Sequence, residues 1–404
     1  LGAFLSPDLF FFYAFHELAL IPTFLTIGLL GRGDRKEIAW KVTIYLAFGS
    51  IILLAGLLWL VAASGTASLG FDDLFKSTVP IAAQRGIALL LIIGFGTLVS
   101  LFPFHSWAAP AYASAPAPVA MLHAGVLKKF GLYGLLRLFP LVPEGMHSWL
   151  ELLIVLLLGN ILWVGYVTIN QKRLDSLLGN SSVMHMGYIF LAIAALTDAG
   201  SEIVNPIAKP AAILLMFGHG ITIAMLFGLA DRIERQTGTL ELRDLGGLAR
   251  KAPALAFLFG LAGMASIGLP GLANFAGEVM VFIAGFKGWE PYGGLGWVQI
   301  ATILSLWGVV ISAVYMLRAY RDIFQGPAVR LTKDATDLTK ADRAPAIVLA
   351  TVLLVVGLCP NILLHFLKDP VEEEGIAREV ITAQAAKFPE NGTSTLNSQP
   401  SHNR

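Results

Sequence analysis

The chain has 404 residues, of which 56% are hydrophobic and 14% are charged, and it carries a net charge of +1 at pH 7. Because soluble domains carry about 25% charged residues, this composition excludes an ordinary soluble domain. A net charge so close to zero also gives no electrostatic reason to expect a nucleic-acid partner. The apolar residues come in long runs without alternation, which predicts helices that cross a lipid bilayer.

Ten apolar runs have the length of about 20 residues that a helix needs to cross a bilayer. In chain order they lie at residues 8–30, 40–63, 81–102, 117–138, 149–170, 177–198, 207–230, 253–286, 296–317 and 344–366. The predicted fold class is therefore all-α, a polytopic membrane protein of about ten transmembrane helices. Residues 1–366 are expected to form one membrane domain. Residues 367–404 are expected to form a flexible polar tail, because their composition is typical of disorder.

Two of the ten runs contain a proline that is expected to break the helix. The third run reaches Pro103, and the eighth is interrupted by Ile-Gly-Leu-Pro-Gly-Leu at residues 267–272. The breaks are five runs apart, which is an odd number, so a five-helix repeat would lie inverted in the membrane. Broken helices in corresponding positions mark the transport site of many transporters. The pattern therefore predicts inverted five-helix repeats, the first without its opening helix.

The distribution of Lys and Arg residues predicts the orientation in the membrane. Most of those outside the apolar runs fall in alternate loops, at residues 31–41, 171–176, 231–251 and 318–343, whereas the loops between these hold few. Loops rich in Lys and Arg face the cytoplasm in most membrane proteins. We therefore expect these four loops, together with residues 103–116, which belong to the same alternating set, to lie on the cytoplasmic side.

Ionisable side chains inside the apolar runs are candidates for function, because each costs about 2.5–3.5 kcal/mol at the centre of a membrane helix. Glu17 lies in the first run, and Glu278 follows the second break. Lys128 and Lys129 lie in the middle of the fourth run, where loss of water favours release of the ammonium proton. Adjacent residues point about 100° apart on a helix. One lysine is therefore expected to line a path, and the other to snorkel or pair.

Two histidines, His185 and His219, lie in neighbouring runs. An imidazole can accept a proton on one ring nitrogen and release one from the other, as a relay requires. Taken alone, each is explained equally well as a core histidine bonded to the backbone. Together with the carboxyls and lysines they predict a lateral series of protonatable groups, which indicates proton transport. Spacings typical of metal ligands are absent from the sequence, so no metal site is expected.

The sequence offers no motif for a redox cofactor. Cys359 is the single cysteine and is expected to be a buried, inert thiol. A Cys-x-x-Cys pair for an iron–sulfur cluster and a Gly-x-Gly-x-x-Gly motif after a strand for a dinucleotide are both missing. We therefore expect the chain to bind no cofactor and any electron transfer to occur on a partner protein.

Six motifs occur in the same order as in a known family. They are Phe-His-Glu-Leu-Ala-Leu-Ile-Pro (15–22), Pro-Phe-His-Ser-Trp (103–107), Ala-Gly-Val-Leu-Lys-Lys-Phe-Gly-Leu-Tyr-Gly-Leu-Leu-Arg (124–137), Ser-Ser-Val-Met-His-Met-Gly (181–187), Gly-Leu-Pro-Gly-Leu-Ala-Asn-Phe-Ala-Gly-Glu (268–278) and Ser-Ala-Val-Tyr-Met-Leu-Arg (312–318). In these motifs the chain resembles the antiporter-like membrane subunits of complex I, of the subunit M or mitochondrial subunit 4 type. The resemblance covers residues 8–325.

The resemblance implies a fold of fourteen helices with two inverted five-helix repeats. The ten runs resemble helices five to fourteen, so the first four helices are expected to be missing from this sequence. It also implies a proton-translocating subunit of an NADH:quinone oxidoreductase complex in a bacterial inner membrane. NADH, quinone, FMN and iron–sulfur clusters are then expected on partner subunits, with other membrane subunits and the lipid bilayer as neighbours.

The resemblance also implies roles for single residues. Glu17 and Glu278 match the glutamates of the family's fifth and twelfth helices, and His185 and His219 match its two intramembrane histidines. Lys129 matches the central lysine. Lys128 stands at a usually apolar position and is a further candidate.

Three further places depart from the family pattern. Leu98 stands where the first broken helix usually carries a lysine, so Glu17 lacks its usual cation and is expected to hold its proton more tightly. Ala-Ala-Pro-Ala-Tyr at 108–112 replaces Leu-Pro-Asp-Ala-His, and Asp175 replaces a lysine. Two alternatives therefore stay open. One is a subunit of a related cation/proton antiporter, membrane-bound hydrogenase or inorganic-carbon uptake complex, and the other is a non-conducting structural subunit.

Overall fold

The computed structural model describes residues 1–198, 205–287, 289 and 294–367. The expected polar tail therefore lies outside the described residues, apart from Leu367. Residues 1–360 form one compact unit, and Asn361 begins a second. The regular structure of the described residues is helical, apart from two isolated β-bridges, Asp8 with Gly70 and Arg173 with Glu241. The predicted all-α fold class is confirmed.

Nine helical segments in the described residues are long and apolar enough to cross a membrane. Six are single helices: α2 (Leu9–Leu30), α3 (Arg35–Ser64), α5 (Ile81–Val99), α12 (Leu174–Asp198), α13 (Ala208–Thr237) and α16 (Trp297–Phe324). A seventh single helix is α17 (Lys340–Leu358). The other two are composite: α7 (Ala117–Leu122), η1 (His123–Leu127), α8 (Lys129–Leu138) and η2 (Phe139–Leu141), and then α10 (Leu150–Leu158), η3 (Gly159–Val164) and α11 (Gly165–Ile169). With the expected eighth span, they make the predicted ten.

Short helices connect or follow these segments. They are α1 (Gly2–Leu5), α4 (Phe71–Lys76), α6 (Ala108–Ser114), α9 (Pro143–His147), η4 (Leu242–Asp244), η5 (Leu248–Arg250), α18 (Asn361–Leu364) and η7 (His365–Leu367). The expected eighth span consists of two short apolar helices, α14 (Pro253–Ile267) and α15 (Ala273–Gly285). The predicted second break is therefore observed, with Gly268 in a left-handed conformation at its start (φ +83°).

The first predicted break is also observed. Helix α5 ends at Val99, and α6 begins at Ala108, so Pro103 lies between two helices. Asn160, which is fully buried in η3, holds this break: its side-chain amide donates to the carbonyl of Ser100 (3.1 Å) and its side-chain oxygen accepts from the backbone N–H of Phe102 (2.6 Å). Non-helical backbone is tolerated at membrane depth when protein groups satisfy it in this way.

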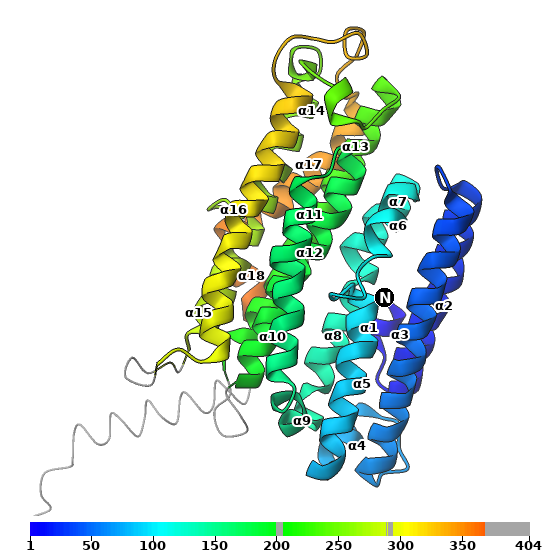
Figure 1. The fold of residues 1–404 in the computed structure, drawn as a ribbon, viewed down its shortest axis with the longest axis vertical. Coiled ribbons are helices and arrows are strands. Elements are labelled where there is room, and N and C mark those ends of the chain that lie inside the picture. The colour runs from blue at the N-terminus through cyan, green and yellow to red at the C-terminus, as the bar shows by residue number, and fades with distance from the viewer. Residues whose placement is uncertain (199–204, 288, 290–293, 368–404) are drawn as a thin grey trace, which may run out of the picture. The chain divides into compact units, whose positions relative to one another are not determined.

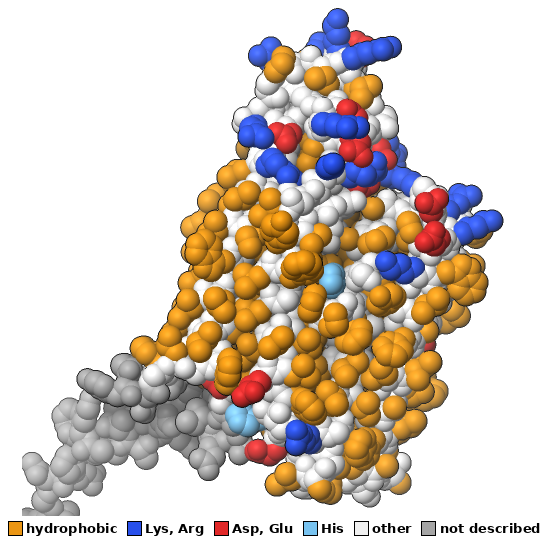
Figure 2. All heavy atoms as spheres, in the orientation of Figure 1, with side chains coloured by type: hydrophobic (Ala, Val, Ile, Leu, Met, Phe, Trp, Pro, Cys, Tyr) orange, Lys and Arg blue, Asp and Glu red, His pale blue; other side chains and the backbone are white. Residues whose placement is uncertain are grey.

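Helix α12 is the most deeply buried of the membrane helices in the described residues, since 94% of the residues in its most apolar stretch are buried. It contacts α6, α10, α13, α15 and α16, and it lies among the green helices in the middle of Figure 1. Helices α2 and α17 are the most exposed of the membrane helices. Figure 2 shows hydrophobic side chains over the visible face and Lys and Arg side chains gathered beyond one end of this belt. This distribution is that of an integral membrane protein.

Cys359 is exposed, so the prediction of a buried thiol was wrong. Helix α17 ends at Leu358, ahead of Pro360, which cannot continue a helix and favours an extended preceding residue. Cys359 is therefore the residue that caps the helix rather than part of its packed face.

Asp337 fixes the start of α14, the helix that leads to the second break. Its carboxylate accepts the backbone N–H groups of Ala254 and Leu255 (both 3.1 Å) and pairs with Arg343 (3.0 Å). Burial alone would raise the pKa of Asp337, but N–H donors from Leu338, Ala254 and Leu255, together with the Arg343 guanidinium, lower it below its ordinary value. The carboxylate form is therefore the one that the fold stabilises.

We expect Asp337→Ala to lower the free energy of unfolding by about 1 kcal/mol, as for the loss of a helix cap. Because the folded-state pKa is lowered, this contribution is present above the unfolded pKa and is lost as the pH falls through the folded pKa, that is, below about pH 4. Thermal unfolding in detergent between neutral and acidic pH measures the difference. Asp334→Ala, an exposed residue of the same loop, is the control and should unfold as the wild type does.

Candidate functional site

Lys129 and His219 meet in the interior of the protein. Lys129 begins α8 and is 5% exposed, and His219 lies in the middle of α13 and is 3% exposed. The Lys129 Nζ is 3.0 Å from the His219 Nδ1 and also donates to the backbone carbonyl of Ala124. An amine and an imidazole at hydrogen-bond distance can exchange a proton directly.

His185 of α12 continues this series. Its ring lies beside that of His219, with 5.6 Å between the ring centroids. Its Nδ1 is 2.8 Å from the carbonyl oxygen of Ser181, and its Nε2 is 2.8 Å from that of Ser266, which lies in α14. Carbonyl oxygens only accept, so a neutral ring satisfies one of them and a protonated ring satisfies both. Both carbonyl oxygens are therefore satisfied only when each ring nitrogen carries a proton.

Glu278 of α15 lies at the second helix break and is 4% exposed. Its carboxylate lies directly against Gly268, two residues beyond the Ser266 carbonyl that binds His185, and a Cβ at position 268 would collide with its Oε2. Its Oε1 is buried and has no hydrogen-bond partner among the described residues. The order from α8 to α15 is therefore lysine, histidine, histidine, broken helix and carboxyl.

Lys128 is buried as well, but its amine points to a different helix. The Lys128 Nζ donates to the carbonyl and to the hydroxyl of Ser182 in α12 (3.1 and 3.2 Å). Snorkelling of one lysine, which the sequence had allowed, is not observed, because Lys128 is only 2% exposed and its amine is satisfied inside the protein. The turn before it, η1, is π-helical, which changes the angular register of the two lysines, and such turns are frequent at functional sites.

Glu17 is not part of this series. It lies in α2, is half-buried, and accepts a hydrogen bond from the hydroxyl of Ser50 in α3. None of the described Lys and Arg residues lies within ion-pair distance of it. Leu98 is buried. The rings of His16 and Phe130 stack face to face with 4.2 Å between their centroids. His16 precedes Glu17 in the chain and Phe130 follows Lys129, so aromatic rings occupy this contact between α2 and α8.

Several polar residues of this region were not predicted from the sequence. Ser182 and Ser266 contribute backbone carbonyls, and Asn160 holds the first break. An amide in the middle of an apolar run is a signal that could have singled out Asn160. The two serines carry no such signal, because both bind through backbone oxygens, and Ser182 adds only its hydroxyl.

A family model described as NADH:quinone oxidoreductase/Mrp antiporter, TM, matches residues 6–318. The chain belongs to this family. Among its relatives, NAD(P)H-quinone oxidoreductase chain 4 1 of Picosynechococcus sp. is 32% identical over 398 residues, which cover 97% of this chain and 72% of the relative. NADH-quinone oxidoreductase subunit M of Rickettsia felis is 30% identical over 375 residues, which cover 92% of this chain and 72% of the relative.

Two solved structures resemble this antiporter-like chain. A chain of respiratory complex I from Thermus thermophilus with bound NADH is 29% identical, with a TM-score of 0.78, and the match covers 88% of this chain and 72% of that one. A chain of the Mrp complex from Dietzia sp. is 22% identical, with a TM-score of 0.76, and the match covers 90% of this chain and 73% of that one. The second likeness supports the fold alone. The antiporter-like fold and a multi-pass membrane location are thus established for this chain.

Proposed function

We propose that this antiporter-like chain is a proton-translocating membrane subunit of an NADH:quinone oxidoreductase complex. The observation that carries the proposal is the buried series Lys129, His219 and His185, which leads to the broken helix beside Glu278. Ionisable groups at this depth are expensive and are found where ions or protons move. The subunit M relative and the complex I structure support the assignment to an NADH:quinone oxidoreductase complex.

Each residue of the series has a distinct role in this proposal. Lys129 alternates between ammonium and amine, and the two histidines pass its proton toward α14 and α15. For this step the His185 ring turns away from the carbonyl oxygens of Ser181 and Ser266, so that one ring nitrogen accepts the proton and the other releases one. Glu278 takes up the proton beside the unwound backbone and releases it on the side opposite the cytoplasm. Glu17, which lies outside the series, modulates the charge state of Lys129. Lys128 is a further candidate for carrying protons.

We infer that the chain acts as one subunit of a translocase and has no redox centre of its own. The single cysteine and the lack of dinucleotide and cluster motifs support this inference. NADH, quinone, FMN and iron–sulfur clusters belong to partner subunits in this proposal. Other membrane subunits of the same complex are its neighbours in a bacterial inner membrane, and the Rickettsia felis relative supports this placement.

The test is a purification of the assembled complex through a tag on this chain, followed by reconstitution into sealed proteoliposomes. NADH oxidation with a soluble quinone is expected to acidify the lumen until an uncoupler is added. The variant Leu98→Lys, with Leu98→Met as control, tests the alternative hypothesis that the protein is a non-conducting structural subunit. Our proposal expects no higher proton-to-NADH ratio in Leu98→Lys. A wild type that moves no protons, together with a Leu98→Lys variant that does, would favour the structural reading instead.

A further inference from the structure

Tyr112 is a buried polar residue that has no role in the Lys129 series. It lies in α6, directly after the first helix break, and is only 3% exposed. Its hydroxyl has no hydrogen-bond partner among the described residues. A buried hydroxyl without a partner is unfavourable, so its position calls for a water molecule or another polar group.

The phenol ring of Tyr112 lies beside the amine of Lys128, with 5.6 Å between the Nζ and the ring centroid. The remaining rings around it are those of Trp107, His123 and Phe227, at centroid distances of 6.4, 5.6 and 5.8 Å. His123 is buried, and its Nδ1 also has no partner among the described residues. The Tyr112 ring is thus packed between the buried amine of Lys128 and three other rings.

A small cavity lies beside Tyr112. It has a volume of about 20 Å³ and is lined by Tyr112 together with Arg32, Asp175, Asp231 and Glu234. A cavity of about 10–15 Å³ is enough to hold one water molecule when polar groups line it. Among the residues that line the cavity, Tyr112 is the one whose buried side-chain polar atom has no hydrogen-bond partner among the described residues.

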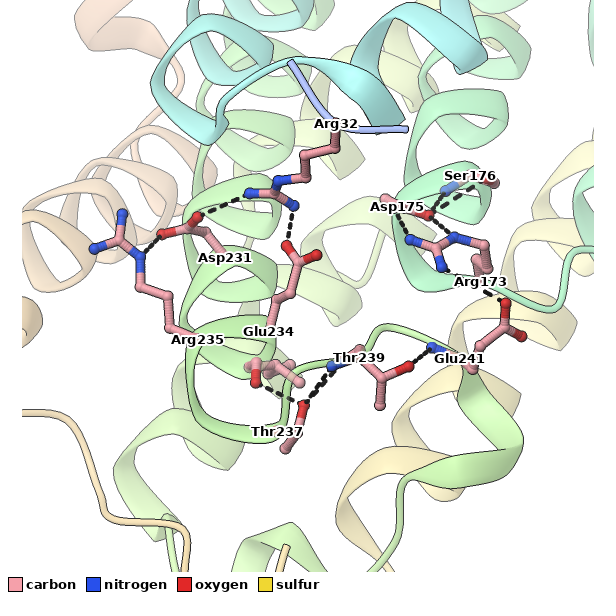
Figure 3. A network of polar contacts seen from close by, with 11 residues as sticks. Arg32, Arg173, Asp175, Ser176, Asp231, Glu234, Arg235, Thr237, Thr239 and Glu241 are labelled. Atoms are coloured by element: carbon pink, nitrogen blue, oxygen red, sulfur yellow. Dashed lines mark hydrogen bonds and ion pairs between the residues drawn. The ribbon is translucent and has the colours of Figure 1, made fainter. Parts of the chain in front are cut away.

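Ion pairs lie beside the cavity, at the end of the molecule that is rich in Lys and Arg. Figure 3 shows Arg32 between Asp231 and Glu234, with its guanidinium 3.3 Å from Asp231 and bonded to Glu234. Arg235 pairs with Asp231 (2.6 Å), and Arg173 pairs with Asp175 (2.8 Å). Together with the ion pair between Arg173 and Glu241 (3.6 Å), these contacts also bring together three of the loops that the sequence assigns to the cytoplasmic side.

We propose that this cavity is a proton-loading site, in which a water molecule bound to Tyr112 passes protons from the cytoplasmic face to Lys128. The carboxylates of Asp175, Asp231 and Glu234 attract protons to the opening, and the ion pairs with Arg32 keep it narrow. The inference rests on the proposed function, because it adds a route of uptake to a protein that moves protons.

The transfer conserves protons and leaves Tyr112 unchanged. The water in the cavity gives one proton to the phenol oxygen, while the phenol gives its own proton to the neutral amine of Lys128. The water is then reprotonated from the cytoplasmic side. For this step the Lys128 side chain turns from Ser182 toward the phenol, which its rotatable bonds permit, and it turns back as an ammonium to the carbonyl and hydroxyl of Ser182.

The decisive variant is Tyr112→Phe, which removes the hydroxyl and keeps the ring that packs on Phe227 and Lys128. NADH-driven proton uptake is measured in sealed inverted membrane vesicles and normalised to the rate of NADH oxidation. We expect a loss of about 100-fold, the lower end of the range for removal of a positioned proton-transfer group. Tyr112→His should restore part of the uptake, because imidazole also relays protons. A purely structural role of Tyr112 would not produce this rescue.

Lys128→Met provides a second measurement. It is expected to cause the same loss, and the double variant Tyr112→Phe/Lys128→Met should lose no more than either single variant, since both act in one route. Tyr166→Phe, a lipid-facing tyrosine of α11, is the matched control and should leave uptake unchanged. Wild-type uptake by Tyr112→Phe, while Lys129→Ala has lost it, overturns the loading site alone. A wild-type complex without uptake overturns the proposed function as well.

Discussion

Lys129→Ala is expected to abolish NADH-driven proton uptake in sealed vesicles while the complex still assembles. Lys129 is the amine that reaches His219, and alanine removes the group with which that imidazole exchanges a proton. The measurement is fluorescence quenching by a pH-sensitive dye during NADH oxidation, with the assembled complex quantified in the same membranes. Uptake should fall to the level seen with an uncoupler, whereas Lys36→Ala, an exposed lysine of α3, should leave it unchanged.

Lys129→Arg separates two explanations of that loss. Arginine keeps the positive charge but does not release its proton in proteins. If Lys129 works by changing its charge, Lys129→Arg should be as inactive as Lys129→Ala. Full uptake by the arginine variant would mean that a fixed charge is sufficient, and the proposed role of Lys129 would then be wrong. Glu278→Gln should be equally inactive, because glutamine cannot carry the proton onward.

Gly268→Ala should disable the second break in a different way. Gly268 has a φ of +83°, and a Cβ there would collide with Oε2 of Glu278. The left-handed conformation costs a residue with a side chain about 1–2 kcal/mol. We therefore expect a lower unfolding temperature and a loss of proton uptake, because the carboxyl must leave its place beside the break.

Gly238→Ala is the matched control for this prediction. Gly238 ends α13 with a φ of +73° and has no atom within 4 Å of an added Cβ. Both variants should lose similar stability in thermal unfolding, but Gly238→Ala should keep its proton uptake. If Gly268→Ala also kept full uptake, the position of the Glu278 carboxyl would not matter for transport.

The sequence predicted the spans well because each membrane helix corresponds to one continuous apolar run in the sequence. A run of apolar residues has to be helical in lipid, so its length and place follow from composition alone. Pro103 and the Gly-Leu-Pro-Gly segment likewise predicted both breaks, since proline cannot continue a helix. The exposure of Cys359 was missed, because the apolar run gave no sign of which side would face outward.

The candidate residues were found because charge in an apolar run is visible in the sequence, but their partners were not. Tyr112, Lys128 and Asp175 each depart from the family pattern, and only the structure shows that Tyr112 lies beside Lys128 and shares a cavity with Asp175. Lys128 and Lys129 are neighbours in the chain, yet their amines bind different helices, Ser182 in α12 and His219 in α13.

By itself the sequence determined that this protein is a helical membrane protein, where its helices break, and which buried groups carry charge. Those properties depend on how each residue interacts with lipid and with its own backbone. The tertiary structure alone decided that Lys129, His219 and His185 form one series while Glu17 stands apart. Such distances depend on how helices far apart in the chain pack against each other, and hydropathy holds no information about that packing.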